Sequence, residues 1–195
     1  MSEHDDAQFV ADVVVGTIGF LSALGGLASL AFERRLRLTV TRKARRVLAA
    51  RGRIAAAAFA RDEAERLYRL QTNLLQIKLV EEQVRMLYKQ NVIAAIQAAG
   101  LKKTGRLESQ VFVYKRNRAT NSTQTLRIGS GTVFISFPLR FPKNRGVQYG
   151  FVLNGRIGAK GHGFIERAKL ATANSPAGLR LYQLAYVRSR LLRGY

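Results

Sequence analysis

The feature that most constrains this chain is a long stretch without helix breakers. Between Thr41 and Ala99 the sequence has no proline and a single glycine, Gly52. Proline and glycine are the residues that interrupt helices most strongly, so their near absence predicts one long helical region. Gly100 follows at the position where a helix commonly ends in a left-handed glycine. We therefore expect a helical region over residues 41 to 99 that ends at Gly100.

One side of this helix carries an apolar stripe. Its members alternate at spacings of three and four, and Glu81 is the one polar interruption. Residues at these spacings lie on one helix face, so the stripe predicts packing against a partner. The stripe consists of Leu67, Leu70, Leu74, Ile77, Val84 and Tyr88.

Charge is the most extreme property of the composition. Lys and Arg number 33 against 12 Asp and Glu, which gives a net charge of +21. Residues 1 to 32 carry −4, residues 33 to 61 carry +9, residues 62 to 100 are balanced, and residues 101 to 195 carry +16. This imbalance indicates a partner rich in negative charge, such as nucleic acid, phospholipid or an acidic protein surface.

An uncharged apolar segment, residues 13 to 32, precedes the basic region. Its length meets the requirement of about 20 apolar residues for a membrane-spanning helix, and the basic residues that follow would suit a cytoplasmic flank. A helix buried in a protein oligomer is the other interpretation, because heavy use of Gly and Ala also suits close helix packing. Hydropathy alone does not separate the two environments.

After Gly100 the periodicity changes from helix to strand. Residues 107 to 116 and 132 to 137 are rich in β-branched and aromatic residues and predict antiparallel strands, and residues 147 to 155 form a third apolar element. Residues 163 to 173 predict a short helix. Ser175 and Pro176 supply an N-cap and a first-turn proline for a last helix.

The predicted fold class is therefore α+β, with long N-terminal helices followed by a small antiparallel β-sheet with packed C-terminal helices. We expect three regions. Residues 1–40 form an apolar helix with its basic flank, residues 41–100 form the long helical region, and residues 101–195 form a small α+β domain with a C-terminal helix.

Little in the sequence supports enzymatic chemistry. There is no cysteine and there are two histidines, His4 and His162, which leaves almost no material for a zinc site or a catalytic triad. Four glycines between Gly155 and Gly163 do not match a P-loop or a dinucleotide-binding motif in spacing or following residues. Anion binding beside Arg156 and Lys160 stays open, but a flexible connector is favoured. We expect no enzyme activity, cofactor or metal.

Basic residues in the helix and in the predicted loops are candidates for contact with DNA or an acidic partner. Lys and Arg attract phosphates without regard to sequence, in a salt-dependent manner. The candidates are Arg42, Lys43, Arg45, Arg46, Lys102, Lys103, Arg106, Arg156 and Lys160.

Two short stretches resemble a known family. In the first, a long helix ends just before Thr104-Gly105-Arg106-Leu107 and a strand. In the second, Tyr149 and Gly155 precede a loop and then Gly163-Phe164-Ile165-Glu166-Arg167-Ala168. This order resembles the neck and tail-completion (head-tail joining) proteins of tailed bacteriophages. The likeness covers residues 61 to 173. The sequence departs from the family pattern at two positions. Gly163 stands where the family has proline, and Asn154 stands where the family has an acidic residue.

The resemblance implies a non-enzymatic structural protein of the virion. Such a protein forms a homo-oligomeric ring in the neck between head or portal and tail, with the host cytoplasm as the site of assembly. Its partners would be further copies of itself, connector or tail proteins, and the double-stranded DNA that passes through the ring. A membrane-associated basic protein anchored by residues 13 to 32 and a non-specific nucleic-acid-binding protein are the alternatives. Candidate inter-subunit or anchoring residues are Thr104, Gly105, Leu107, Tyr149, Gly155, Phe164 and Ile165.

Overall fold

The computed structural model of the chain describes residues 3–25, 30–101, 106–116, 124–141, 149–155 and 161–194. The chain divides into two compact units. Unit 1 comprises Met1–Leu74 with Leu191–Tyr195, and unit 2 comprises Leu75–Arg190. The architecture is mostly helical with a small three-stranded antiparallel sheet, which confirms the predicted α+β class.

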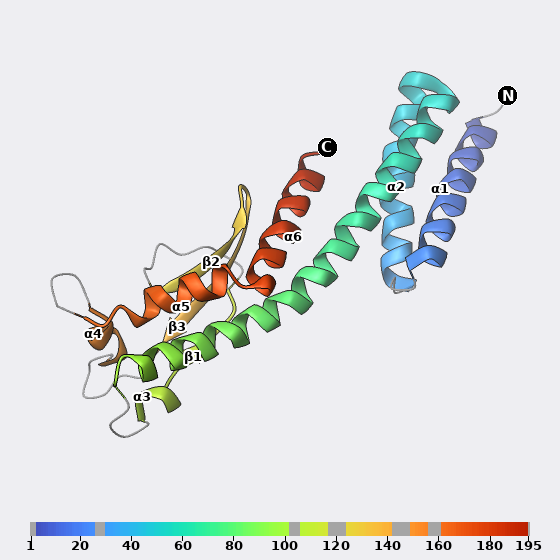
Figure 1. The fold of residues 1–195 in the computed structure, drawn as a ribbon. Coiled ribbons are helices and arrows are strands. Elements are labelled where there is room, and N and C mark those ends of the chain that lie inside the picture. The colour runs from blue at the N-terminus through green and yellow to red at the C-terminus, as the bar shows by residue number, and fades with distance from the viewer. Residues whose placement is uncertain are drawn as a thin grey trace. The chain divides into compact units, whose positions relative to one another are not determined.

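Unit 1 is built from helices that reverse direction at a single glycine. Helix α1 spans Glu3–Gly25 and α2 spans Leu30–Ala98, and α2 is interrupted at Gly52 (φ 78°, ψ 179°). That backbone conformation is essentially restricted to glycine. The first arm of α2, residues 30 to 51, and its second arm, residues 53 to 74, therefore run antiparallel, with α1 beside them (Figure 1).

Each of these three helical segments contributes a residue to the core at every fourth position. This spacing forms the ridges that pack into the grooves of a neighbouring helix. On the second arm all the contributing residues are alanines, whose small side chains let the helices approach closely. The buried residues are Val10, Val14 and Ile18 of α1, Leu36, Val40 and Ala44 of the first arm, and Ala56, Ala60 and Ala64 of the second arm.

Polar contacts near Gly52 and along the two arms add to this core. Asp6 of α1 pairs with Arg53, and the Arg53 guanidinium lies 5.5 Å from the ring centroid of Phe9. Lys43 on the first arm donates to Glu63 on the second arm at 2.6 Å. These contacts hold α1 and both arms together in unit 1.

The apolar segment 13 to 32 does not form the single helix that its hydropathy predicts. Helix α1 ends at Gly25 and α2 begins at Leu30, with residues 26 to 29 outside the described part. Among the described residues, no helix is both long and apolar enough to cross a membrane.

Unit 2 contains the sheet. Strands β1 (Phe112–Val113), β2 (Thr125–Ser130) and β3 (Val133–Arg140) are ordered β1-β3-β2 and all pairs are antiparallel. Ser130 pairs with Val133 across a two-residue turn, so β2 and β3 form a hairpin. The inner face of the sheet is apolar and buried, with Val113, Ile135 and Phe137 among its members.

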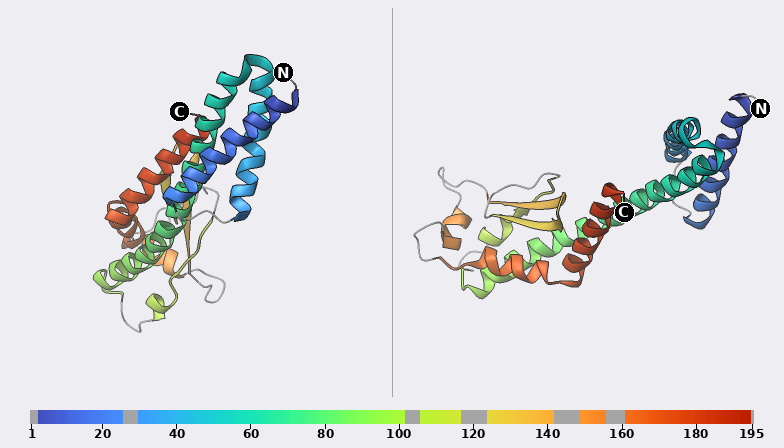
Figure 2. Two further views of the ribbon diagram at one scale, coloured as in Figure 1. Left: turned by 90° about the vertical axis from the view of Figure 1, so that its right-hand side faces the viewer. Right: turned by 90° about the horizontal axis from the view of Figure 1, so that it is seen from above.

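Helices cover this inner face (Figure 2). The stripe of α2 continues through Ile77, Val84 and Tyr88 into the unit 2 core, together with residues of α5 (Phe164–Ala173) and α6 (Pro176–Arg193). The partner of the stripe in unit 2 thus lies in the same chain. Glu81, the interruption in the stripe, is 7% exposed and pairs with Lys115.

Three helix boundaries agree with their sequence signals. Gly100 adopts φ 69°, and the N–H groups of Gly100 and Leu101 donate to the carbonyls of Gln97 and Ile96, which is a Schellman motif. Helix α5 begins at Phe164. The Ser175 hydroxyl accepts from the Gly178 N–H and caps α6.

Other boundaries correct the sequence-based predictions. Residues 107 to 116 form a short helix, α3 (Arg106–Ser109), and the two-residue strand β1 rather than one long strand. The third apolar element, whose type was not assigned from the sequence, contains the helix α4 (Tyr149–Gly155). Strand β2 was not among the predicted strands, and its last two residues, Gly129 and Ser130, pair with β3.

Candidate functional site

The first candidate surface lies on the first arm of α2, opposite the residues that it buries. Arg42, Arg45 and Arg46 are exposed there, while Val40 and Ala44 face the unit 1 core. The three residues span about 6 Å along the helix axis at 1.5 Å per residue. None of the three makes an ion pair within the described part of the chain. We call Arg42, Arg45 and Arg46 the basic face.

Lys43, predicted to belong with these arginines, has a structural partner instead. Its ammonium group pairs with Glu63, which is 7% exposed and also accepts hydrogen bonds from Arg66. The hydrogen bond from Arg66, with help from Lys43, lowers the pKa of Glu63 although burial acts in the opposite direction. The charge of Lys43 is therefore partly neutralised by Glu63 within unit 1.

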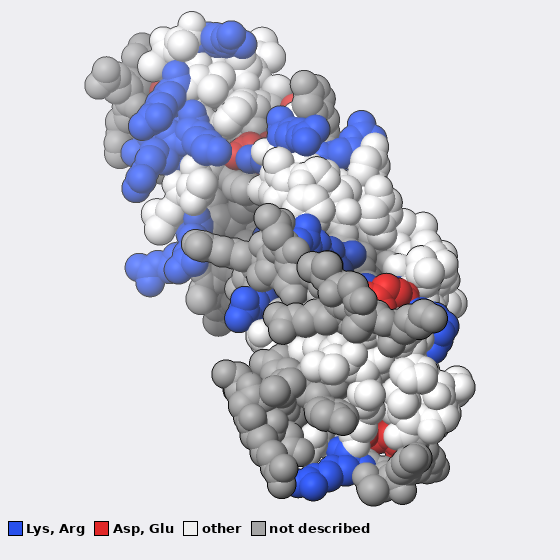
Figure 3. All heavy atoms as spheres, turned by 90° about the vertical axis from the view of Figure 1, so that its left-hand side faces the viewer, with Lys and Arg blue, Asp and Glu red and all other residues white. Residues whose placement is uncertain are grey.

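Of the remaining basic candidates, Arg106 lies in the described part of the chain. Arg106 is exposed on α3. Lys102, Lys103, Arg156 and Lys160 lie outside the described residues, as do the anchoring candidates Thr104 and Gly105. Figure 3 shows that Lys and Arg are widely spread over the face it draws, with few Asp and Glu side chains among them.

The glycine cluster is closed at its base by direct backbone contact. A Cβ added at Gly161 would lie 2.0 Å from the Cα of Gly155, and Gly155 has φ +96°. The N–H groups of His162 and Gly163 donate to the carbonyls of Leu153 and Asn154. Glycine is thus required at this base because the two strands of the loop approach too closely for any side chain.

The start of α5 does not resemble an anion cradle. The Ile165 N–H in the first turn donates to Asn154 Oδ1 at 2.7 Å, and Asn154 Nδ2 donates to Glu166 at 3.0 Å. Asn154 Oδ1 therefore already accepts from one of the backbone N–H groups that would bind an anion at this helix start, and the Glu166 carboxylate in the first turn would repel one.

Phe164 and Ile165 are buried in the core of unit 2, as predicted. Phe164 packs edge-on against Phe141, with 6.3 Å between ring centroids. Leu107 is half-buried against the same core, and Tyr149 is the first residue of α4. Burial places Phe164 and Ile165 in an anchoring role within the subunit.

Sequence reasoning missed an exposed aromatic surface on the sheet. Phe112 (53% exposed), Tyr114 and Phe134 lie on the face of the sheet turned away from the helices, and we call this the outer face. The Arg116 guanidinium lies 5.2 Å from the Tyr114 ring centroid. Phe112 and Tyr114 flank the buried Val113, as successive side chains of a strand point to opposite faces, but β3 is buried from Ile135 to Leu139 and shows no such alternation.

A second exposed apolar surface lies on α6. Leu179, Tyr182, Tyr186 and Val187 are each about half exposed, and their spacings place them on one side of the helix. The opposite side, with Leu181 and three small residues, is buried. We call the four exposed residues the α6 stripe. The helical spacing of the α6 stripe can be read from the sequence. The buried side of α6 has helical spacing too, so the sequence alone does not tell the two sides apart.

No group of three His, Cys, Asp or Glu side chains that could hold a metal ion occurs in the described ranges. His162 and Glu166 are both exposed, and Glu166 is engaged by Asn154. Comparison with protein-family models, with curated proteins and with solved structures finds no match to this chain.

Proposed function

We propose that this protein is a structural component of a tailed-phage virion that forms a homo-oligomeric ring in the neck, between head or portal and tail. The observation that carries the proposal is the pair of apolar surfaces on unit 2, the outer face and the α6 stripe. Burying each of their large side chains contributes roughly 1.5 to 3 kcal/mol, so leaving both in water is unfavourable. Exposed large apolar side chains that gather on one face of an element are typical of sites of protein association.

The two surfaces differ in a way that favours a ring over a simple dimer. A two-fold dimer pairs one surface with itself, whereas a ring needs two different surfaces on each subunit. The outer face lies on a sheet, and the α6 stripe lies on a helix whose opposite side is buried. One subunit therefore offers two chemically distinct contacts, one to each neighbour or to another virion protein.

The resemblance to neck proteins supplies the setting. The order of elements in unit 2 supports it: a long helix ending at Gly100, a short sheet, a glycine-closed loop, and a helix entering the core at Phe164. This order matches what the resemblance implies for residues 61 to 173. The virion, with assembly in the host cytoplasm, is the corresponding location.

The basic face supports a place beside DNA. Arg42, Arg45 and Arg46 carry charges that no described acidic side chain neutralises. Unpaired exposed guanidiniums attract phosphates and release counterions from DNA on contact. Within a ring, these residues would border the passage of double-stranded DNA or meet an acidic virion neighbour.

Native mass determination and electron microscopy of the purified protein test the proposal. We expect closed rings at micromolar concentration, and density for the same ring between head and tail in intact virions. A protein that stays monomeric in low and high salt, with no such ring in virions, would rule the proposal out.

A further inference from the structure

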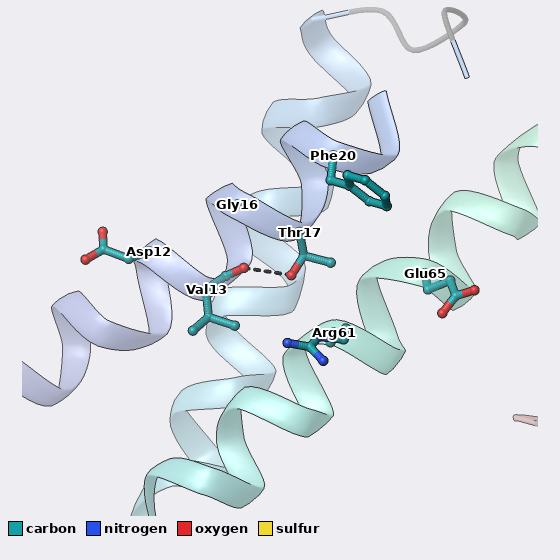
Figure 4. Close-up of a pocket in the computed structure, with 7 residues that line it drawn as sticks. All are labelled: Asp12, Val13, Gly16, Thr17, Phe20, Arg61 and Glu65. Carbon is teal, nitrogen blue, oxygen red and sulfur yellow. Dashed lines mark hydrogen bonds between the residues drawn. The ribbon is translucent and has the colours of Figure 1, made fainter. Parts of the chain in front are cut away.

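A groove of about 640 Å³ runs between α1 and the second arm of α2 in unit 1. Figure 4 shows Phe20 projecting from α1 toward α2, while Arg61 extends from the second arm. Val13, Gly16 and Thr17 line the α1 side, and Asp12 lies toward one end. Phe20 is 65% exposed, so most of this large apolar side chain is open to solvent.

Gly16 lines the α1 side of this groove, and Gly19 lies about one turn further along α1. A Cβ placed at Gly16 or Gly19 would meet no atom within 4 Å. Neither glycine is therefore required by packing inside the subunit. Small residues on a helix surface let a second helix approach closely, so the open positions suit a helical occupant.

The α6 stripe has the dimensions of such an occupant. Leu179 and Tyr186 are seven residues apart, about 10 Å along the helix, and Asp12 and Phe20 span about 12 Å along α1 at 1.5 Å per residue. The stripe offers bulky side chains, and the groove offers Gly16, which has none, on its α1 side.

Charge is a stronger argument than shape for α6 as the occupant of the groove. Helix α1 carries four acidic residues and no Lys or Arg, although the chain as a whole is strongly basic. Helix α6 carries four arginines and no acidic residue, and Arg190 continues the line of the α6 stripe. Asp6 already pairs with Arg53, and the groove is lined by Asp12, Arg61 and Glu65, so Asp12 and Glu65 are the acidic residues that would meet the arginines of α6. The acidic residues of α1 are Glu3, Asp5, Asp6 and Asp12, and the basic residues of α6 are Arg180, Arg188, Arg190 and Arg193.

We propose that α6 of a second copy of this chain docks in the groove between α1 and α2, with the α6 stripe against Gly16 and Phe20. The proposal rests on the ring assembly proposed above and names its subunit contact. It uses the groove on one side of a subunit and α6 on another, which is the head-to-tail type of contact that can close a ring. The outer face then stays available for a different virion protein.

Engineered cysteines test this contact directly, because the chain has none of its own. Gly16→Cys lies at the centre of the groove, and Gln183→Cys lies at the centre of the exposed side of α6, so the pair meets in either orientation of α6. The two single variants are purified, mixed as full-length chains and oxidised. We expect a disulfide-linked pair between unlike variants. Gly16→Cys mixed with Lys78→Cys, an exposed position on α2, is the control and should give no pair.

The outcomes separate this contact from the ring itself. If rings form but positions 16 and 183 do not cross-link, the docking proposal is wrong and the ring stands. Cross-linked pairs that close as dimers would support the docking and overturn the ring. Cross-linking of position 16 to itself would also contradict the docking, because it requires α1 to face α1.

Substitutions in the α6 stripe provide a second, non-covalent readout. Leu179→Asp and Tyr186→Ala should each raise the dissociation constant of the assembly roughly tenfold or more, as expected for residues central to an interface. Leu170→Ala, on α5, removes a side chain of similar exposure and should leave it unchanged. Equal effects of all three would contradict the proposal. Circular dichroism would check that each variant is folded.

Discussion

Asn154 and Ile165 are joined across the glycine loop: the Ile165 backbone N–H donates to Asn154 Oδ1 at 2.7 Å. The asparagine therefore caps the first turn of α5 from outside that helix, while Gly163 at the N-cap position has no side chain to do so. A distant side chain thus replaces the usual local cap, and it ties the end of α4 to the start of α5.

Removing this cap should destabilise unit 2. Asn154→Ala leaves the Ile165 N–H without its acceptor, and loss of an N-cap acceptor typically costs about 1 kcal/mol, or up to about 2. Chemical denaturation measures the change in the free energy of unfolding. Asn174→Ala, at the exposed C-cap of α5, is the matched control and should change stability by less than about 0.5 kcal/mol.

The base of the glycine loop should be intolerant of any side chain. In Gly161→Ala the new Cβ would lie 2.0 Å from the Cα of Gly155, so the backbone must move, and we expect a cost of at least about 2 kcal/mol. Gly163→Ala is the control. Its φ of +56° is unfavourable for alanine by about 1 to 2 kcal/mol, but no atom lies near the new Cβ. Equal thermal stability of Gly161→Ala and the parent protein would refute the close contact.

Phe164 should be the larger energetic anchor of α5. Phe164→Ala deletes a fully buried ring that packs against Phe141, and such a change costs roughly 3 to 5 kcal/mol. Leu170→Ala on the same helix removes a 65% exposed side chain and should be nearly neutral. Unfolding by urea compares the two variants. The Phe164→Ala variant should fail to assemble under any condition in which it is unfolded.

Glu63 should make the stability of unit 1 depend on pH. Its hydrogen bond from Arg66 lowers its pKa below the ordinary value of 4.5, so the folded state favours the carboxylate. That stabilisation is present above pH 4.5 and is lost as pH falls through the lowered pKa. Glu63→Gln should therefore be less stable than the parent at pH 7 and approach it below the lowered pKa. A constant difference from pH 7 to pH 3 would contradict this assignment.

The basic face should contribute to DNA binding in a salt-dependent way. Each phosphate contact changes the slope of log K against log salt by about 0.9, so Arg42→Gln with Arg46→Gln should reduce that slope by about 1.8. Arg37→Gln with Arg69→Gln removes the same charge from residues that already pair with Glu33 and Glu65. Titration of a labelled duplex measures both. Identical slopes for the two double variants would show that net charge alone governs binding.

The helical part of the fold was predictable because its signals are local. The absence of proline, the glycines at 52 and 100, and the Ser175-Pro176 cap each act within one helical turn. The structure places a chain reversal at Gly52, where the sequence indicated only a break. The direction of the reversal depends on the core that both arms share, with Ala44 and Ala60 among its members, and the pattern of a single helix does not contain that information.

The elements that sequence reasoning missed are decided by distant contacts. Residues 149 to 155 are a short apolar run that suits strand or helix equally, and the helix α4 places Gly150 against the Phe141 ring. Strand β2 contains Gly129 and resembles a turn until β3 pairs with it. The exposed aromatics of the outer face depend on which face the helices cover, which is a property of the whole unit.

Gly52 also makes the antiparallel arms of unit 1 depend on a single backbone geometry. Any residue with a side chain would favour ordinary helical angles there and so bias α2 toward one uninterrupted rod. Val40 and Ala44 share their core with the alanines of the second arm, so a substitution at Gly52 would loosen the packing of residues far from the substituted position.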